Sequence, residues 1–362
     1  MASSSFFKGK SKKFLYDYLN SESPTGFETA GQRVWLDYVK PFVHEYFTDT
    51  YGTVVGVINP DAPYRVVIEA HCDEISWFVN YISKEGYIHV IRNGGSDYVI
   101  APSKRVKIHG EKGIVPAVFG WPAIHVREKR EEAKLDVETV VLDCGAESDE
   151  EVRALGVDVG SVVTFEDQLI ELNSKCLVGR ALDNRIGGFM IAEVARLLHE
   201  NKVELPYGLY VTNAVQEEIG LRGAEMIARR IKPHVALVTD VCHDTGSPGY
   251  SKIKQGEQKL GKGPVLTFAP AVQNNLLRML FDVARSREIP FQRAAASRFS
   301  GTDTDAFAYS NEGVASALVS LPLKYMHTTV EMAHFQDIDN VIRLIYEFLV
   351  QLPDGHDFRY IT

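Results

Sequence analysis

The sequence predicts an α/β protein, in which a mixed, largely parallel sheet is sandwiched by helices and interrupted by a β-rich insertion. From Asn173 onward, short runs of β-branched residues alternate with segments that carry apolar residues at helical spacing. Between Ser76 and Asn173, short apolar runs instead follow one another and are separated by turns such as KEG and GEKG. Strands that alternate with helices favour a covered, mostly parallel sheet, whereas successive strands favour an antiparallel unit.

The N-terminal part predicts two helices followed by two strands. Residues 14–43 carry apolar residues at helical spacing around a break at Ser23–Gly26, which indicates two short helices joined by a turn. The runs TVVGVIN and YRVVIEAH follow, with a proline-containing turn at Asn59–Pro63 between them. We expect these two runs to form paired strands.

The middle of the chain predicts a separate, barrel-like β domain. Its expected strands are SWFVNYIS, GYIHVIRN, RVKIHG, GIVPAVFG, TVVLDC and SVVTF, and only DEEVRALG is typical of a helix. We therefore expect residues 76–173 to be inserted into one α/β domain that comprises residues 1–75 and 174–362.

The second half of the α/β domain predicts regular alternation. A helical apolar stripe runs from Ile186 to Leu198, and the strand GLYVTNAV, the helix GAEMIARRI and the strand HVALVTD follow it. The helix NNLLRMLFDVARSR, the strand ASALVSLPL and a closing helix over 338–349 complete the domain.

Composition excludes several classes of protein. The 362 residues contain 39 Lys and Arg against 48 Asp and Glu, a net charge of −9, which argues against a nucleic-acid partner. No apolar run approaches the roughly 18 residues of a membrane span, and the N-terminus lacks a signal-peptide core. The four cysteines form no CxxC pair, so we expect reduced thiols and a cytoplasmic protein that contacts no membrane.

Polar side chains of metal-binding type follow the ends of the predicted strands. His71-Cys72-Asp73-Glu74 follows one strand, Glu217-Glu218 another, and Asp240 and His327 follow two more, while Asp183 stands at the entry to a helix. Ligands of open α/β sheets bind outside the carboxyl ends of the strands, so these residues are expected to converge.

The residue types indicate a centre of two metal ions. Two histidines, two aspartates and one glutamate suit zinc, cobalt or manganese, and five ligands exceed one tetrahedral site. Two ions that share one carboxylate would use five ligands and leave room for water, as in two-metal hydrolases. Of the adjacent Glu217 and Glu218, one can bind metal while the other acts as general base.

Simpler structural interpretations exist for single residues. Asp183 alone is typical of a helix N-cap, and Cys72 and Cys242 are typical of wall residues. The remaining histidines are expected on the surface or in the core, with His243 near enough to Asp240 to support the centre: His44, His89, His109, His125, His199, His234, His243, His334 and His356. No GxSxG, P-loop or GxGxxG motif is present.

The ordered segments AHCDEI, VGRALDNRIGG, QEEIGLRGAE, LVTDVCH, SGTDTDAF and KYMHTTVE resemble the motifs of the glutamyl and tetrahedral aminopeptidases, a family of dinuclear metallopeptidases. The likeness covers nearly the whole chain. It implies a zinc-peptidase-like catalytic domain, and it implies that the insertion is a dimerisation domain. It also implies release of single N-terminal residues from short peptides by an assembly that is typically a tetrahedral dodecamer.

The resemblance further implies a role for each candidate residue. His71, Asp183 and Asp240 would hold one ion, and Asp183 would bridge to a second ion held by Glu218 and His327. Glu217 would be the general base, and Asp73 would orient His71. The peptide bond after Asp183 is expected to be cis.

Departures from the family pattern bear on specificity. Ser76 stands where glycine is usual, and Asp305 stands where a smaller residue is usual. Asp305 would favour basic or neutral N-terminal side chains, whereas nearby Arg298 would favour acidic ones. His125 lies in a loop that resembles one reaching a neighbouring subunit's site in this family.

Three alternatives remain open. A carboxypeptidase or deacylase could use the same metal centre. A glycoside hydrolase is a second alternative, because some members of the family have been labelled endoglucanases and the paired acids Glu217 and Glu218 are present. The third is an assembly module that has lost catalysis.

Overall fold

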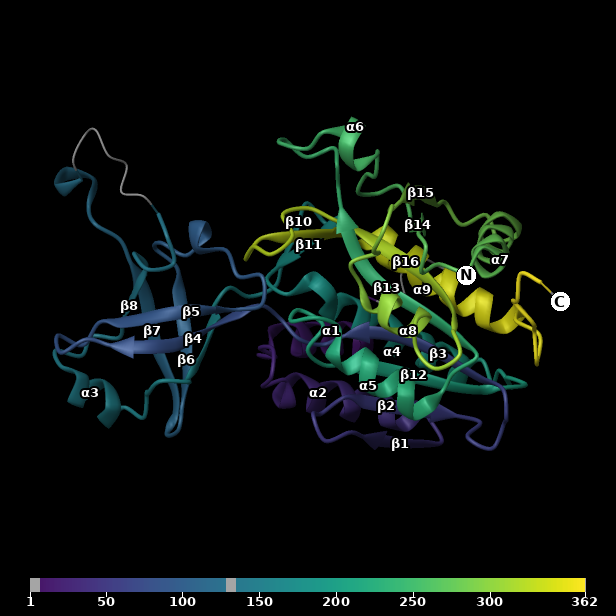
Figure 1. Cartoon of the computed structure of the whole chain (residues 1–362), viewed down its shortest axis with the longest axis horizontal. Coiled ribbons are helices and arrows are strands. Elements are labelled where there is room, and N and C mark those ends of the chain that lie inside the picture. Colours follow the sequence, from purple (N-terminus) through teal and green to yellow (C-terminus); the bar gives the residue numbers. More distant parts are fainter. Residues whose placement is uncertain (1–6, 128–134, 362) are drawn as a thin grey trace.

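The computed structural model describes residues 7–127 and 135–361, which form a large α/β part and a smaller closed barrel that stands to one side of it (Figure 1). The predicted class, a mixed and largely parallel sheet with helices and a β-rich insertion, is confirmed.

An eight-stranded sheet is the centre of the α/β part. The four middle strands β12, β3, β13 and β16 run parallel, so their carboxyl ends meet at one edge. Antiparallel neighbours flank them on both sides. In spatial order the strands are β1 (Glu45–Thr48), β2 (Val54–Ile58), β12 (Gly208–Ala214), β3 (Arg65–His71), β13 (Val235–His243), β16 (Ala315–Leu323), β14 (Val265–Phe268) and β15 (Gln292–Ala295).

The expected pairing of the first two long strands is wrong. β12 lies between β2 and β3, antiparallel to the former and parallel to the latter. Residues 59–64 step over this strand, a distance of about 9.6 Å that six residues easily span. The proline-containing turn in this segment allows β2 to pair with β3 directly or with β12 between them, so the local sequence did not distinguish the two arrangements.

Two groups of helices pack on the sheet. The predicted pair α1 (Gly9–Asn20) and α2 (Thr29–Val39) is confirmed, and both helices pack on α4, which lies against β3 and also contacts α9. α5 packs on α8, which lies against β13 and β16. The remaining helices are bounded as follows: α4 (Leu182–Glu200), α5 (Arg222–Ile231), α6 (Lys252–Gln255), α7 (Asn274–Ser286), α8 (Asp303–Ala308) and α9 (Phe335–Gln351).

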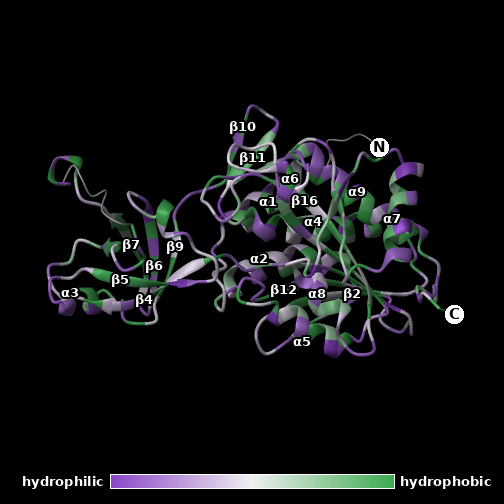
Figure 2. Cartoon of the chain, turned by 45° about the horizontal axis from the view of Figure 1, so that its top comes forward, coloured by the Kyte–Doolittle hydropathy of each residue, from purple (hydrophilic) through white to green (hydrophobic). Residues whose placement is uncertain are grey.

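The insertion contains a closed six-stranded barrel with an apolar core of its own, which includes Trp77 and Phe119. Figure 2 shows apolar residues on the barrel strands as well as in the larger part. Around the barrel lie β4 (Ser76–Ile82), β5 (Ile88–Asn93), β8 (Val141–Asp143), β7 (Gly113–Gly120), β6 (Arg105–Gly110) and β9 (Val162–Phe165). The predicted helix is present as α3 (Asp149–Ala154).

A small three-stranded sheet leads from the barrel back to the α/β part. β10 (Ile170–Leu172) pairs with β11 (Cys176–Gly179), which pairs with β17 (Glu331–His334). The last strand of the barrel ends at Phe165, and the next strand, β10, pairs with β11 outside the barrel. Among the described residues, no helix combines the length and the apolar character needed to cross a bilayer.

Candidate metal centre

The residues predicted from the strand ends come together at the carboxyl edge of the parallel strands. His71 is the last residue of β3, and Glu217 and Glu218 follow the end of β12 at Ala214. His327 follows the end of β16 at Leu323. Asp240 differs from the expectation, because β13 continues past it to His243.

The first group of potential ligands consists of His71, Asp183 and Asp240, all buried, whose ligand atoms lie within 4.8 Å of one another. His71 Nε2 is 3.3 Å from Asp183 Oδ1 and 3.8 Å from Asp240 Oδ1. An imidazole and two carboxylates around one point are suitable ligands for a divalent ion.

The second group consists of Asp183, Glu218 and His327, again with ligand atoms within 4.8 Å of one another. His327 Nε2 is 3.3 Å from Asp183 Oδ2 and 3.4 Å from Glu218 Oε2. Asp183 therefore faces the two imidazoles with different oxygens, as a bridging carboxylate would. Glu217 lies near as well, with Oε2 3.7 Å from His71 Nε2.

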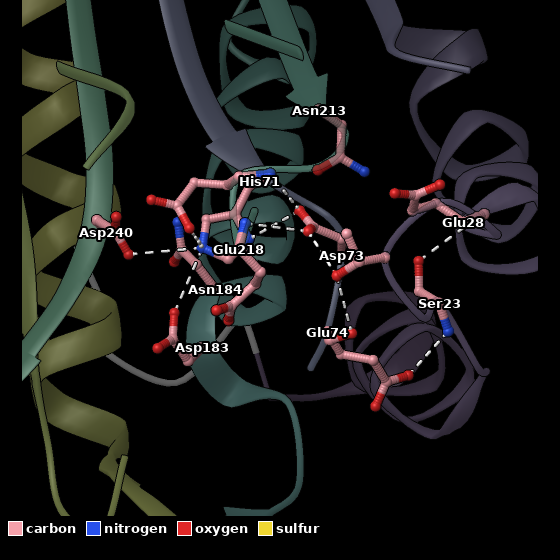
Figure 3. A network of polar contacts seen from close by, with 12 residues as sticks. Ser23, Glu28, His71, Asp73, Glu74, Asp183, Asn184, Asn213, Glu218 and Asp240 are labelled. Atoms are coloured by element: carbon pink, nitrogen blue, oxygen red, sulfur yellow. Dashed lines mark hydrogen bonds and ion pairs between the residues drawn. The ribbon is translucent and has the colours of Figure 1, made fainter. Parts of the chain in front are cut away.

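Asp73 connects several of these elements beneath the centre (Figure 3). Its Oδ1 lies 3.3 Å from His71 Nδ1 and accepts the Glu217 N–H at 3.0 Å. Its Oδ2 accepts the Glu218 N–H at 3.2 Å and the Thr25 hydroxyl at 2.9 Å. One buried carboxylate thus contacts both a histidine ring and the backbone of the adjacent glutamates.

The start of α4 is irregular around Asp183. The Asp183–Asn184 peptide bond is cis, as the resemblance implies, and neither residue has helical backbone angles. Asn184 Nδ2 donates to the Thr239 carbonyl at 2.7 Å, which ties this turn to β13. The N-cap position belongs to Ala181, so Asp183 is not the simple helix cap that its position suggests.

Buried carboxylates outnumber the histidines at the centre, and burial shifts their pKa values. Burial raises the pKa of Glu217 to about 10 and that of Asp240 to about 7. Burial lowers the pKa of His327, but hydrogen bonds to Asp183 and Glu218 outweigh it and raise the value to about 11. Burial raises the pKa of Asp183 as well, but hydrogen bonds to His327 and His71 outweigh it and lower the value. Divalent ions bound at the centre would balance the negative charge of these carboxylates in place of protons.

Comparisons with known proteins identify the family. The description of the M42 glutamyl aminopeptidases matches residues 52–344. The chain belongs to this family. A relative is the lysyl aminopeptidase of Pyrococcus furiosus, 34% identical over 336 residues that cover 91% of this chain and 95% of that protein. The prediction of a metal-dependent aminopeptidase, a peptide hydrolase, is confirmed at the level of the family.

Solved structures of similar fold belong to related peptidases. A TET aminopeptidase from a marine-sediment archaeon of the Thaumarchaeota has a TM-score of 0.89 at 29% identity, over 95% of this chain and 97% of that one. The TET1 peptidase of Pyrococcus horikoshii, which assembles into a tetrahedron or a large octahedral shell, has a TM-score of 0.84 at 27% identity, over 94% of this chain and 99% of that one.

Three buried carboxylates of this M42 peptidase were missed by the sequence analysis. Glu331 accepts backbone N–H groups of Asp183 and His327. Glu69 and Asp303 lie together under the centre, and burial raises the pKa of Glu69 to about 8 and that of Asp303 well above its usual range. The acid within the apolar run VVIEAH was the available signal for Glu69.

A cavity of about 970 Å³ opens from the centre of the M42 peptidase and includes the apolar side chains of Leu221, Phe299 and Met326 in its lining. Asp305 lines it too, and its carboxylate accepts the N–H groups of Ser300 and Gly301, both at 3.1 Å. Arg298 is exposed and is not part of the lining.

The other histidines take no part in the metal-binding groups found among the described residues. Three of them accept backbone N–H groups through Nδ1: His44, His234 and His334. His243 lines the cavity and contacts Tyr250, while His125 is exposed on a short turn of the barrel. The hydroxyl of Ser76 accepts a hydrogen bond from Asn93 Nδ2 at 2.8 Å.

Proposed function

We propose that this M42 peptidase is a dinuclear metalloaminopeptidase that releases N-terminal residues from short peptides. The observation that carries the proposal is the placement of Asp183 between two ligand groups, one oxygen facing His71 and the other facing His327. A shared carboxylate is the economical way to hold two ions at the ~3.5–4 Å separation of two-metal hydrolases.

The donor set suits two divalent ions, with zinc as the first choice and cobalt or manganese as alternatives. His71, Asp183 and Asp240 would hold one ion, and Asp183, Glu218 and His327 the other. Ions bound there would polarise the scissile carbonyl and lower the pKa of the attacking water.

Glu217 is proposed as the general base. The two proposed ligand sets do not include it, and its Oε2 lies 3.7 Å from His71 Nε2 in a third group of potential ligands, which it forms with His71 and Glu218. Burial raises its pKa to about 10 in the ion-free protein, and positive charge at the centre would lower this value toward neutrality. A carboxylate so placed can take the proton of the attacking water and pass it to the leaving amine.

The cavity supports a preference for neutral or basic N-terminal side chains. Asp305 contributes a buried carboxylate to the lining, whereas Arg298, the residue that would favour acidic side chains, lies outside it. The P. furiosus relative is named for lysyl substrates, whose basic side chain is of the kind that a carboxylate in the cavity would favour. The family name refers to glutamyl substrates, and the relative turnover of lysyl and glutamyl anilides distinguishes the two preferences.

The proposal extends to the assembly and the location of the protein. The TET1 peptidase of P. horikoshii can assemble into a tetrahedron or a large octahedral shell, and we propose for this chain a tetrahedral dodecamer built from dimers, with the barrel domain of residues 76–173 as the dimerisation unit. The four cysteines are free, which agrees with a cytoplasmic location.

Two of the alternatives agree less well with the geometry. Glycoside hydrolysis needs two carboxylates about 5–9.5 Å apart on opposite sides of a bond, but Glu217 and Glu218 are sequence neighbours that face the same imidazole, His71. An inactive assembly module would be expected to have lost a metal ligand or the general base, whereas this chain keeps all five proposed ligands and Glu217. A carboxypeptidase or deacylase shares the centre and is distinguished only by substrate.

The test is hydrolysis of glutamyl, lysyl and leucyl anilides, with N-acetylated versions as controls, before and after chelation and with zinc, cobalt or manganese added back. We expect chelator-sensitive turnover of free-amine substrates only. Glu217→Gln should reduce turnover about 10²–10⁴-fold, the usual contribution of a general base, while both ions stay bound. Turnover of acetylated substrates, or full activity of Glu217→Gln, would contradict the proposal.

A further inference from the structure

Glu331 is a buried carboxylate at the start of β17, directly behind the centre. Only 2% of its surface is exposed. Its Oε2 accepts the Asp183 N–H at 3.0 Å, and its Oε1 accepts the His327 N–H at 2.7 Å. β17 pairs with β11 through Glu331 and Gly179, so the chain that leads to Asp183 already lies beside this glutamate.

We propose that Glu331 is a positioning residue that sets the distance between Asp183 and His327 and thereby the affinity of the second metal site. The inference rests on the proposed dinuclear centre. In this role Glu331 contacts neither substrate nor ion and acts through the backbone of two proposed ligands.

The two histidines of the centre are oriented in different ways. His71 has a carboxylate beside its ring, because Asp73 Oδ1 lies 3.3 Å from His71 Nδ1. In the part of the chain that the structure describes, the ion pairs of His327 are those with Asp183 and Glu218, and both use Nε2. The other side of its ring lies against Gly95, where a Cβ atom would come within 2.7 Å of Nδ1.

The backbone of His327 needs an external constraint. His327 has φ of 61° and Tyr325 has φ of 60°, left-handed conformations that residues other than glycine rarely adopt. Such conformations persist where surrounding contacts determine them. The loop is closed at its base by the two hydrogen bonds between Lys324 and Met332, both 3.0 Å, and Glu331 holds its tip.

Asp73 performs the same task on the opposite side of the centre. Its two oxygens accept the N–H groups of Glu217 and Glu218, as those of Glu331 accept the N–H groups of Asp183 and His327. A carboxylate is suited to this task because both of its oxygens accept hydrogen bonds. An amide would turn its NH₂ group toward one of the two N–H donors and leave that donor without a partner.

The chain offers a matched control. Asp337 is also fully buried, and its oxygens accept the N–H groups of Gly261 at 2.5 Å and Gly263 at 2.7 Å. Neither glycine belongs to the centre. Asp337→Asn therefore removes the same kind of interaction as Glu331→Gln without touching a proposed ligand.

The experiment removes metal from the full-length wild-type protein, Glu331→Gln and Asp337→Asn, and then titrates cobalt(II) by calorimetry and visible absorption. We expect wild type and Asp337→Asn to bind two ions, and Glu331→Gln to bind the first ion tightly and the second about 10–100-fold more weakly, as for other residues that support ligands from behind. Glu331→Asp keeps the charge but shortens the side chain, so it should also lower the affinity for the second ion. It provides the test if Glu331→Gln does not fold.

Equal affinity of both ions in wild type and Glu331→Gln, or the same weakening in Asp337→Asn, would overturn the role of Glu331 while leaving the proposed function intact. A wild-type protein that binds one ion would refute the dinuclear centre itself, and the role of Glu331 with it.

Discussion

Replacing Asp73 by asparagine removes the charge that lies beneath the centre and preserves its shape. The Asp73 side chain is fully buried, and it contacts His71, the Thr25 hydroxyl and two backbone N–H groups at distances between 2.9 and 3.3 Å. Asparagine offers one acceptor oxygen and one NH₂ group, so at least one of the two backbone donors loses its partner.

The expected loss follows from these contacts. A hydrogen bond to a charged group contributes about 1.5–3 kcal/mol, and one backbone donor together with part of the His71 contact is lost, so we expect a loss of roughly 2–4 kcal/mol in the free energy of unfolding. Because His71 and the segment of Glu218 both lose a support, metal affinity should fall about 10–100-fold.

Urea unfolding of the ion-free protein measures the first quantity, and titration with zinc measures the second. Thr25→Val is the control, because it is close in shape and removes only the hydroxyl, which is 2.9 Å from Asp73 Oδ2 and 3.2 Å from the Glu74 carbonyl oxygen, with an expected loss of about 1 kcal/mol. If Asp73→Asn destabilises the protein no more than Thr25→Val and binds zinc as tightly as wild type, Asp73 does not support the centre.

Three further perturbations have defined outcomes. Hydrogen bonds to carboxylates raise the pKa of His327 to about 11 against the effect of burial, so an ion that binds there must displace a proton. Zinc affinity, measured in a competition titration, should therefore rise up to about tenfold per pH unit between pH 6 and 8. An affinity that does not change with pH would contradict this. Burial and then the charge of Asp73 raise the pKa of Glu28 from 4.5 to about 8, so the folded state holds this proton more tightly than the unfolded state and stability should fall as the pH rises from 4.5 to 8. Urea midpoints of Glu28→Gln should lack that part of the pH dependence, and parallel profiles would rule the assignment out. Phe119 lies in the barrel core, with its ring 5.6 Å from that of Trp77, and Phe119→Ala should reduce the free energy of unfolding of the barrel by about 3–5 kcal/mol. Calorimetry should show a lower transition temperature for the barrel and an unchanged one for the α/β part. A shift of both transitions would show that the two cores unfold together.

Local patterns were sufficient for much of the architecture. The apolar periodicity of 186–198 and 338–349 predicted α4 and α9, and the β-branched runs predicted β3, β12, β13 and β16. The ligand types at the ends of these strands predicted that distant segments converge, because parallel strands in one sheet share a carboxyl edge. The resemblance of the motif series then predicted the family, which the comparison confirms.

The three-dimensional structure was needed for everything that depends on which distant groups are neighbours. The position of β12 between β2 and β3 is such a case, because each strand edge can pair with any other strand and the turn between them allows both orders. Glu331 is a second case, because nothing in the residues around it distinguishes it from a surface glutamate. Its hydrogen bonds to Asp183 and His327 form only when β17 pairs with β11. The sequence by itself determined the main strands and helices and the types of candidate ligand, since these depend on local periodicity and side-chain chemistry. The tertiary structure decided which carboxylate oxygen faces which imidazole and which buried acids accept the backbone N–H groups of the candidate ligands, because such contacts join residues as far apart in sequence as His71 and Asp240.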